Sequence, residues 1–141
     1  MVIREFNLER DYEAALHLWA NSGPGLNVGR SDTREELAKK LERDPDLFLA
    51  AERDGHLVGT VIGGFDGRRG AVYHLAVAEA ERRKGIGTAL MNEVENRLRA
   101  KGCLRAWLAV RPQNAEVLSF YARLGWEPNP ITFLAKNLIA P

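Results

Sequence analysis

The sequence predicts a three-layer α/β domain built on a mixed, mostly antiparallel sheet. Three observations support this prediction. Turn residues recur at regular intervals, two of the turns contain Asp-Gly, and one long amphipathic helix separates two strand patterns. The 141 residues fit a single domain over 1–141, large enough to bury a core without disulfides or a metal.

The first part of the chain is predicted to contain a strand at Val2–Phe6 and a helix at Asp11–Ala20. Within that helix Ala15, Leu18 and Trp19 form an apolar stripe. The following segment, Ser22–Gly29, is rich in loop-forming residues and is predicted to be a mobile connection.

A second helix is predicted to start after Ser31 or Asp32, either of which would be a suitable N-cap. Glu35 and Glu36 are then placed for a capping box. The helix should end at Asp44-Pro45, because the residue before a proline is disfavoured in the α conformation.

Three antiparallel strands are predicted next. Leu47–Glu52 and His56–Phe65 flank the turn Arg53-Asp54-Gly55, where Asp-Gly favours a tight hairpin. A second turn at Asp66-Gly67 leads to the strand Ala71–Val77.

The longest helix should run from the basic turn Arg82–Gly87 to about Ala100, and Gly102 is placed to end it. The strand Arg105–Val110 follows. A right-handed β-α-β crossover would make this strand parallel to 71–77. Asn114 is expected to cap a helix through Leu124, and Ile131–Leu138 to form a last strand.

Composition excludes several classes of protein. A net charge of +1 gives no broad attraction to nucleic acid or to an anionic membrane, so neither partner is expected. No apolar run is long enough to span a bilayer, and the charged N-terminus does not resemble a signal peptide. The single Cys103 fits a reducing cytosol, so we expect a soluble cytoplasmic protein. No cluster of ligand residues has metal-binding spacing, so no metal is expected.

The turn between strand 71–77 and the long helix is the most informative segment. Gly85 and Gly87 leave the backbone uncovered where it enters the helix, so N–H groups and the helix dipole favour a phosphate there. A solvated basic turn is the simpler alternative. The residues concerned are Arg82, Arg83, Lys84, Gly85, Ile86, Gly87 and Thr88.

Two segments carry a resemblance to a known family. Arg82-x-x-Gly85-x-Gly87 resembles the acyl-CoA signature of the GNAT superfamily of N-acetyltransferases. Asn114 and the run Phe120-Tyr121-Ala122-Arg123-Leu124-Gly125-Trp126 resemble its second conserved segment, and the predicted order of elements agrees. The run Gly64–Gly70 is also similar to the YpeA-type bacterial branch.

The resemblance implies that strands 71–77 and 105–110 splay apart and hold acetyl-CoA between them. The pantetheine arm would pair with the backbone of Leu75, Ala76 and Val77, like an added strand. The pyrophosphate would lie on the amides of the turn, and an N–H near Leu75 or Ala76 would stabilise the oxyanion.

The same resemblance makes Tyr121 the acid that protonates the departing thiolate. Tyr121 also lies on the apolar stripe of its helix, so a role in the core is the alternative. Asn114 would contact the cofactor while its side-chain oxygen caps the helix.

The proton acceptor for the amine is left open by the sequence. Ribosomal-protein N-terminal acetyltransferases carry a glutamate at the position of Ala109, which cannot take a proton, and this disfavours that branch. The other candidates are Glu52, Asp66, His74 and Glu79. Alternation of the strand places His74 on the face opposite Tyr73 and Leu75, where it could be an ordinary packed histidine.

The favoured function is therefore acetyl transfer from acetyl-CoA to a primary amine, on a small molecule or a protein, by direct attack. No cysteine lies near either motif, which disfavours a covalent intermediate. A catalytically silent acyl-CoA-binding module is the alternative from another class, and nucleic-acid binding through Arg82–Lys84 is the third. The apolar strand Ile131–Leu138 could also pair with a second copy in a homodimer.

Overall fold

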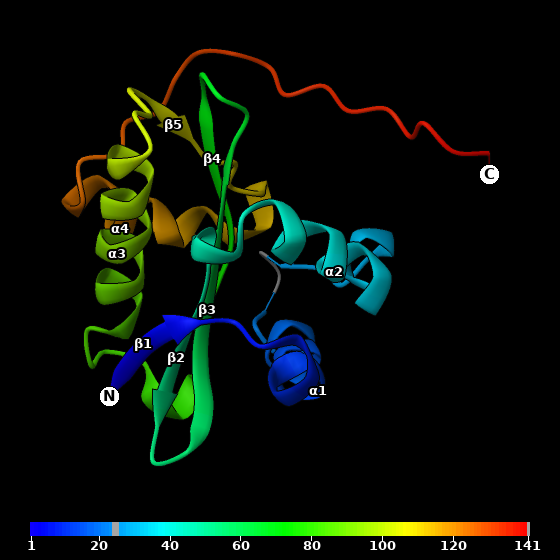
Figure 1. Cartoon of the computed structure of the whole chain (residues 1–141). Coiled ribbons are helices and arrows are strands. Elements are labelled where there is room, and N and C mark those ends of the chain that lie inside the picture. Colours follow the sequence, from blue (N-terminus) through cyan, green and yellow to red (C-terminus); the bar gives the residue numbers. More distant parts are fainter. Residues whose placement is uncertain (24–25, 141) are drawn as a thin grey trace.

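The computed structural model describes residues 1–23 and 26–140, and its centre is a five-stranded sheet with the strand order β1-β2-β3-β4-β5 (Figure 1). Pro24 and Gly25, within the predicted loop 22–29, and Pro141 lie outside the described residues. The strands are β1 (Val2–Glu5), β2 (Phe48–Arg53), β3 (His56–Phe65), β4 (Gly70–Val77) and β5 (Ala106–Trp107). The helices are α1 (Leu8–Ala20), α2 (Arg34–Arg43), α3 (Ile86–Ala100) and α4 (Leu118–Arg123).

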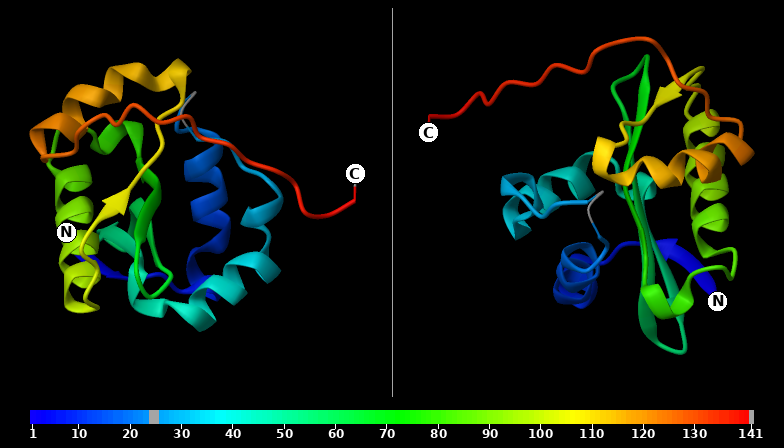
Figure 2. Two further views of the ribbon diagram at one scale, coloured as in Figure 1. Left: turned by 90° about the horizontal axis from the view of Figure 1, so that it is seen from above. Right: turned by 180° about the vertical axis from the view of Figure 1, so that it is seen from behind.

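The elements form the three predicted layers. α1 and α2 cover one face of the sheet, and α3 and α4 cover the other (Figures 1 and 2). β1 to β4 pair antiparallel in sequence, and β4 pairs parallel with β5. The predicted hairpin and the β4-α3-β5 crossover are both confirmed.

The starts of α1 and α2 are set by local caps. The side chain of Asn7 accepts a hydrogen bond from the Arg10 N–H, so α1 begins three residues earlier than predicted. Thr33 caps α2 by accepting from the Glu36 N–H at 3.2 Å. Ser31 and Asp32 were therefore the wrong choice, and Asp32 belongs instead to a short 3-10 helix, Arg30–Asp32.

The core has two parts, one on each face of the sheet. Leu90, Met91 and Val94 of α3 are fully buried against β2, β3 and β4. α3 packs this closely because Gly63 has no side chain: a Cβ there would lie 2.7 Å from Val94 Cγ2. On the other face Trp19 of α1 is fully buried, and its indole N–H donates to the Thr60 hydroxyl at 2.9 Å.

The C-terminal third departs from the prediction in three places. β5 comprises only Ala106–Trp107 rather than 105–110. The last helix starts at Leu118, after an irregular 3-10 segment over Pro112–Val117, and Asn114 makes no capping bond. The predicted strand Ile131–Leu138 is wrong, because these residues have no strand conformation and the tail runs away from the domain (Figure 1).

Within the described part of the chain, no helix combines the length and apolar character needed to cross a membrane.

Candidate active site

The site is a cavity of about 480 Å³ where β4 and the chain after β5 separate. The two strands pair only at Gly70 with Ala106 and Ala71 with Trp107, so the rest of β4 has no partner on that side among the described residues. The predicted splaying is thus confirmed. The cavity is lined by residues 72–77 of β4, 81–83 of the following turn, 108–111, residues from 114 to 121, and parts of 22–27.

A bulge reshapes β4 at the cavity. Opposite β3 the register shifts between Thr60 and Ile62, so that two residues of β4, His74 and Leu75, occupy the space of one. His74 takes a left-handed φ of 51°. Tyr73 and His74 consequently share the α1/α2 side of the sheet, with ring centroids 5.6 Å apart, whereas Leu75 packs with the α3 core. The predicted strict alternation is wrong here because it assumed a regular strand.

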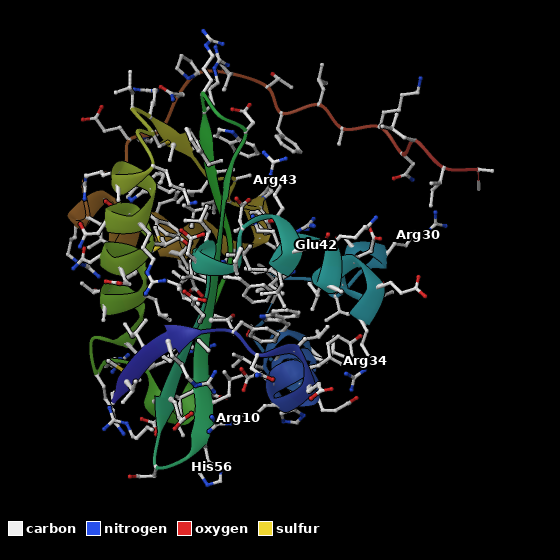
Figure 3. All side chains as sticks on the ribbon, viewed as in Figure 1. Arg10, Arg30, Arg34, Glu42, Arg43 and His56 are labelled. Atoms are coloured by element: carbon white, nitrogen blue, oxygen red, sulfur yellow. The ribbon has the colours of Figure 1, made fainter. Side chains whose placement is uncertain are left out.

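His74 is the histidine that lines the cavity. Its Nε2 lies 2.8 Å from Oδ1 of Asp32, whose other oxygen accepts from the Gly29 N–H at 2.9 Å. Asp32 is 4% exposed. His17 and His56 are exposed, and His56 lies at the tip of the β2–β3 hairpin (Figure 3). The sequence missed Asp32 as a site residue because the pair joins elements 42 positions apart.

The turn before α3 has the geometry of an anion site. Arg83 and Gly85 both have left-handed backbones, with φ of 66° and 80°, and α3 begins directly after them at Ile86. Two such residues just before the first helical turn direct its N–H groups outward. Arg82 and Arg83 line the cavity, while Lys84 pairs with Glu81 at 3.1 Å.

Gly87 serves packing rather than the turn. It lies inside α3, and a Cβ there would be 3.3 Å from the Phe120 ring. The missing side chain lets the α4 segment approach the start of α3. Phe120 in turn stacks edge-on against Tyr121, with ring centroids 5.1 Å apart.

Tyr121 lies on the wall of the cavity and packs at the edge of the α3 core. The packing role considered from the sequence is therefore observed, and the side chain also borders the cavity. Burial raises the pKa of its hydroxyl above the ordinary value, which keeps it protonated at neutral pH. Asn114 also lines the cavity, at a kink with φ −116° and ψ 27°. Its side chain does not cap a helix there, in contrast to the prediction.

The other acidic candidates lie outside the cavity. Glu52 is paired with Arg4 and Arg10 at 2.9 and 2.7 Å. Asp66 accepts the N–H groups of its own hairpin turn, which lower the pKa of its carboxyl. Glu79 begins a short 3-10 helix on the surface. Ala109, by contrast, does line the cavity.

Among the residues described, no cluster of three or more His, Cys, Asp or Glu side chains is arranged to hold a metal ion.

A β-bulge lies beside the splayed edge of a five-stranded mixed sheet, and the turn before α3 and the α4 segment border the cavity that opens there. The model of the acetyltransferase (GNAT) family matches residues 12–126. The chain therefore belongs to the GNAT family of acetyltransferases.

Particular relatives agree with this assignment. The chain is 40% identical over 139 residues to the acetyltransferase ECA0875 of Pectobacterium atrosepticum, covering 99% of this chain and 96% of the relative. The crystal structure of Ard1 from Thermoplasma volcanium is 27% identical with a TM-score of 0.76, covering 88% of this chain and 80% of that one. The PaiA N-acetyltransferase from Thermoplasma acidophilum, solved with coenzyme A, has the same fold at 23% identity, with a TM-score of 0.79 over 93% and 92% of the chains.

Proposed function

We propose that the protein transfers the acetyl group of acetyl-CoA to a primary amine by direct attack. The observation that supports this most is the cavity itself, which is bordered by the basic turn before α3 and by Tyr121. The sole cysteine, Cys103, does not line this cavity, which favours direct attack over a covalent acyl-enzyme.

The residues of the turn and of β4 fit acetyl-CoA. The backbone from Arg83 to Thr88 would hold the pyrophosphate, with Arg82, Arg83 and Lys84 adding positive charge. The unpaired edge of Leu75–Val77 would bind the pantetheine arm as an added strand, and Asn114 would donate to it. An N–H at Leu75 or Ala76 would receive the oxyanion.

Tyr121 is proposed as the acid for the departing thiolate. A tyrosine hydroxyl is protonated at neutral pH, burial raises its pKa further, and Tyr121 lines the cavity. Tyr121→Phe should lower kcat roughly 100-fold, the usual scale of one general acid, with little change in acetyl-CoA affinity. Tyr73→Phe removes a second phenol from the same cavity and should cost much less. Equal losses in both variants would remove Tyr121 from the mechanism.

The first experiment is a thermal melt with acetyl-CoA, with NAD and ATP as controls. A ligand at 100 times its dissociation constant stabilises the folded state by about 2.7 kcal/mol, a shift of several degrees. A rise in melting temperature with acetyl-CoA, and with neither control, supports acetyl-CoA as the acetyl donor. Absence of a shift with any acyl-CoA contradicts the proposal.

Release of free thiol is then followed with propylamine, spermidine, an aminoglycoside and a peptide with a free N-terminus. Acetylation of any primary amine supports the enzyme. Tight acetyl-CoA binding without transfer to this panel would favour the silent binding module. Transfer confined to the peptide N-terminus would favour the N-terminal peptide branch, which Ala109 disfavours.

Two finer assignments belong to the same proposal. The run Gly64–Gly70 supports the YpeA-type branch of the family. The lone Cys103, which leaves no internal disulfide, supports a cytoplasmic location.

A further inference from the structure

The backbone of His74 is held in an unfavourable conformation by a fixed set of contacts. A left-handed φ of 51° is uncommon for a residue other than glycine, and such residues persist where their surroundings enforce them. The Thr60 hydroxyl donates to the His74 carbonyl oxygen at 2.9 Å, and the Trp19 indole in turn donates to Thr60. Thr60 and Trp19 are both fully buried, so the position of His74 is set by the core.

The imidazole is held as firmly as the backbone. Asp32 accepts from Nε2, and its second oxygen is occupied by the Gly29 N–H. The Trp19 ring packs edge-on at 4.8 Å. With Nε2 donating to the carboxylate, the neutral ring carries its free lone pair on Nδ1. A histidine arranged in this way is suited to accept a proton.

We propose that His74, oriented by Asp32, takes the proton of the acceptor amine; this rests on the acetyl transfer proposed above. An alkyl ammonium group must lose a proton before its nitrogen can attack, because its pKa is about 10.4. His74 lines the same cavity as Tyr121 and lies beside Leu75 on β4. The cavity therefore has a proton acceptor on one wall and a proton donor on the other.

His74 and Tyr121 together account for every proton that is transferred in the reaction. The nitrogen forms a C–N bond to the thioester carbon, and the C–S bond breaks. An ammonium acceptor loses two protons overall: His74 takes one and passes it to water. The thiolate receives a proton from Tyr121, which regains one from the nitrogen of the forming amide.

The test compares His74→Asn with His56→Asn. Asparagine tolerates a left-handed backbone but cannot accept a proton near neutral pH, so His74→Asn keeps the bulge and removes the base. We expect kcat/KM for propylamine to fall roughly 100-fold, with the acetyl-CoA thermal shift retained. Asp32→Asn, which disturbs the orientation of the ring, should cost roughly 10-fold. His56→Asn, at the exposed hairpin tip, should behave as the wild type.

The pH profile separates a base from a structural residue. In the wild type both a free amine and a free base are needed, so log kcat/KM should rise more steeply with pH than in a variant that has lost the base. His74→Asn should show a slope of about one throughout. The titratable groups against the imidazole are Asp32 and Tyr73, while α1 and β3 present Trp19 and Thr60. Charged residues elsewhere on the cavity wall are Glu81, Arg82, Arg83, Arg111 and Glu116.

The outcomes distinguish this proposal from the proposed function. Wild-type transfer with an unchanged rate or slope in His74→Asn overturns the role of His74 alone. A wild type that binds no acetyl-CoA, or transfers to no amine, overturns the acetyl transfer and His74 with it.

A second and independent observation concerns the C-terminal tail. Ile131, Leu134 and Leu138 are 80%, 86% and 91% exposed. The tail crosses the end of the sheet and continues beyond α2 (Figures 1 and 2). In a strand, Ile131 and Phe133 would lie on one face and Leu134 and Leu138 on the other, so both faces would carry apolar side chains that this chain leaves uncovered.

The same chain carries a free edge that fits such a strand. β5 pairs with β4 on one side, and its other side opens on a cavity of about 1120 Å³. Leu104 and Trp107, on that side, are 96% and 48% exposed. The chain's own tail contacts this surface near its start, where Phe133 lies 6.0 Å from Trp107 between ring centroids, and then departs.

We infer that the tails of two copies are exchanged, each adding a strand along β5 of the other. A chain with one uncovered apolar tail and one free strand edge satisfies both in a two-fold pair, which closes without further growth. Pro128 and Pro130 favour an extended hinge that carries the tail outward. Leu108, Ala109, Val110 and Tyr121 line both cavities, so the partner's tail would complete a wall of the active site.

The test is the mass in solution of the full chain and of the Leu134→Glu, Leu138→Glu double variant. The wild type should have twice the 15.7 kDa of one chain, with a Tm that rises with protein concentration. The double variant should be a monomer, and Val28→Glu, at an exposed apolar residue outside the tail, should remain a dimer.

Three results would overturn the exchange. The wild type could be a monomer at high concentration, or the double variant could remain a dimer. Alternatively, the double variant could lower a Tm that does not depend on concentration, which would mean that the tail folds back on its own chain.

Discussion

The segment up to Leu98 and the segment after it are packed very differently. Both core clusters consist of residues up to Leu98, and several of them, including Trp19 and Phe48, are fully buried. Beyond Leu98, no described residue is fully buried. α4 rests on the rim of the core through half-buried side chains such as Phe120 and Tyr121.

The difference shows which part of the domain is complete by itself. The first segment buries its apolar residues without help. The second segment presents its apolar residues to a cavity, to a free sheet edge and to solvent, so it is the part that a bound ligand or a second copy would order. The comparison can be tested by four measurements, taken from the largest expected effect to the smallest.

The first measurement compares two tryptophans. Trp19→Ala should lower the free energy of unfolding by about 3–5 kcal/mol, because it empties a fully buried site and removes the donor to Thr60. Trp126→Ala should cost only about 1–2 kcal/mol, since that ring is half-buried and its bond to Glu95 is 3.3 Å long. Urea denaturation measures both. Equal losses would contradict the division at Leu98.

The second measurement is hydrogen exchange with and without acetyl-CoA. At 100 times its dissociation constant the ligand should add about 2.7 kcal/mol to the free energy of unfolding. The largest decrease in exchange rate is expected for the amides of residues 108–123. The exchange rates of the β2 and β3 amides should fall by a smaller factor, because the core already protects these amides without the ligand. Protection confined to β2 and β3 would contradict the placement of the ligand.

The third measurement compares two glycines facing α3 and α4. Gly63→Ala should destabilise by about 2 kcal/mol, because its Cβ would meet the buried Val94 at 2.7 Å. Gly87→Ala should change stability by less than about 1 kcal/mol, since the half-buried Phe120 can move and alanine favours the helix. Thermal melts of both variants measure the two losses of stability. A larger loss at Gly87 would show that α4 is packed as firmly as the core.

The fourth measurement is the pH dependence of Asp11. Burial opposes ionisation of this carboxyl, but hydrogen bonds from Arg4 and the Asn7 N–H outweigh it and lower its pKa. A lowered pKa stabilises the fold above the unfolded value of about 3.9, and this contribution is lost as the pH falls through the folded value.

Asp11→Asn should therefore cost about 1 kcal/mol at pH 7 and nothing at a pH below both values. The exposed Glu9→Gln in the same first turn of α1 is the control. A loss that persists unchanged in acid would mean that packing, rather than charge, holds Asp11.

Most of the element order could be predicted from the sequence, since the hairpin at Asp54-Gly55 and the long helix ending at Gly102 depend on local signals. The predictions that were wrong concern non-local contacts. The bulge at His74 depends on Trp19 and Thr60 from two other elements. Asp32 was predicted as a cap because a local pattern carries no information on its contact with His74, which is distant in the sequence.

By itself the sequence determined the three layers, the glycine turn before α3 and the position of Tyr121 in the last helix. Strand and helix periods and turn chemistry are local properties of the chain, so they can be read from it directly. Only the tertiary structure decided which groups meet in the cavity and which apolar residues stay uncovered. Local signals predicted a strand at Ile131–Leu138, yet a strand forms only where its backbone pairs with an edge, and in this structure the tail does not pair with the free edge of β5.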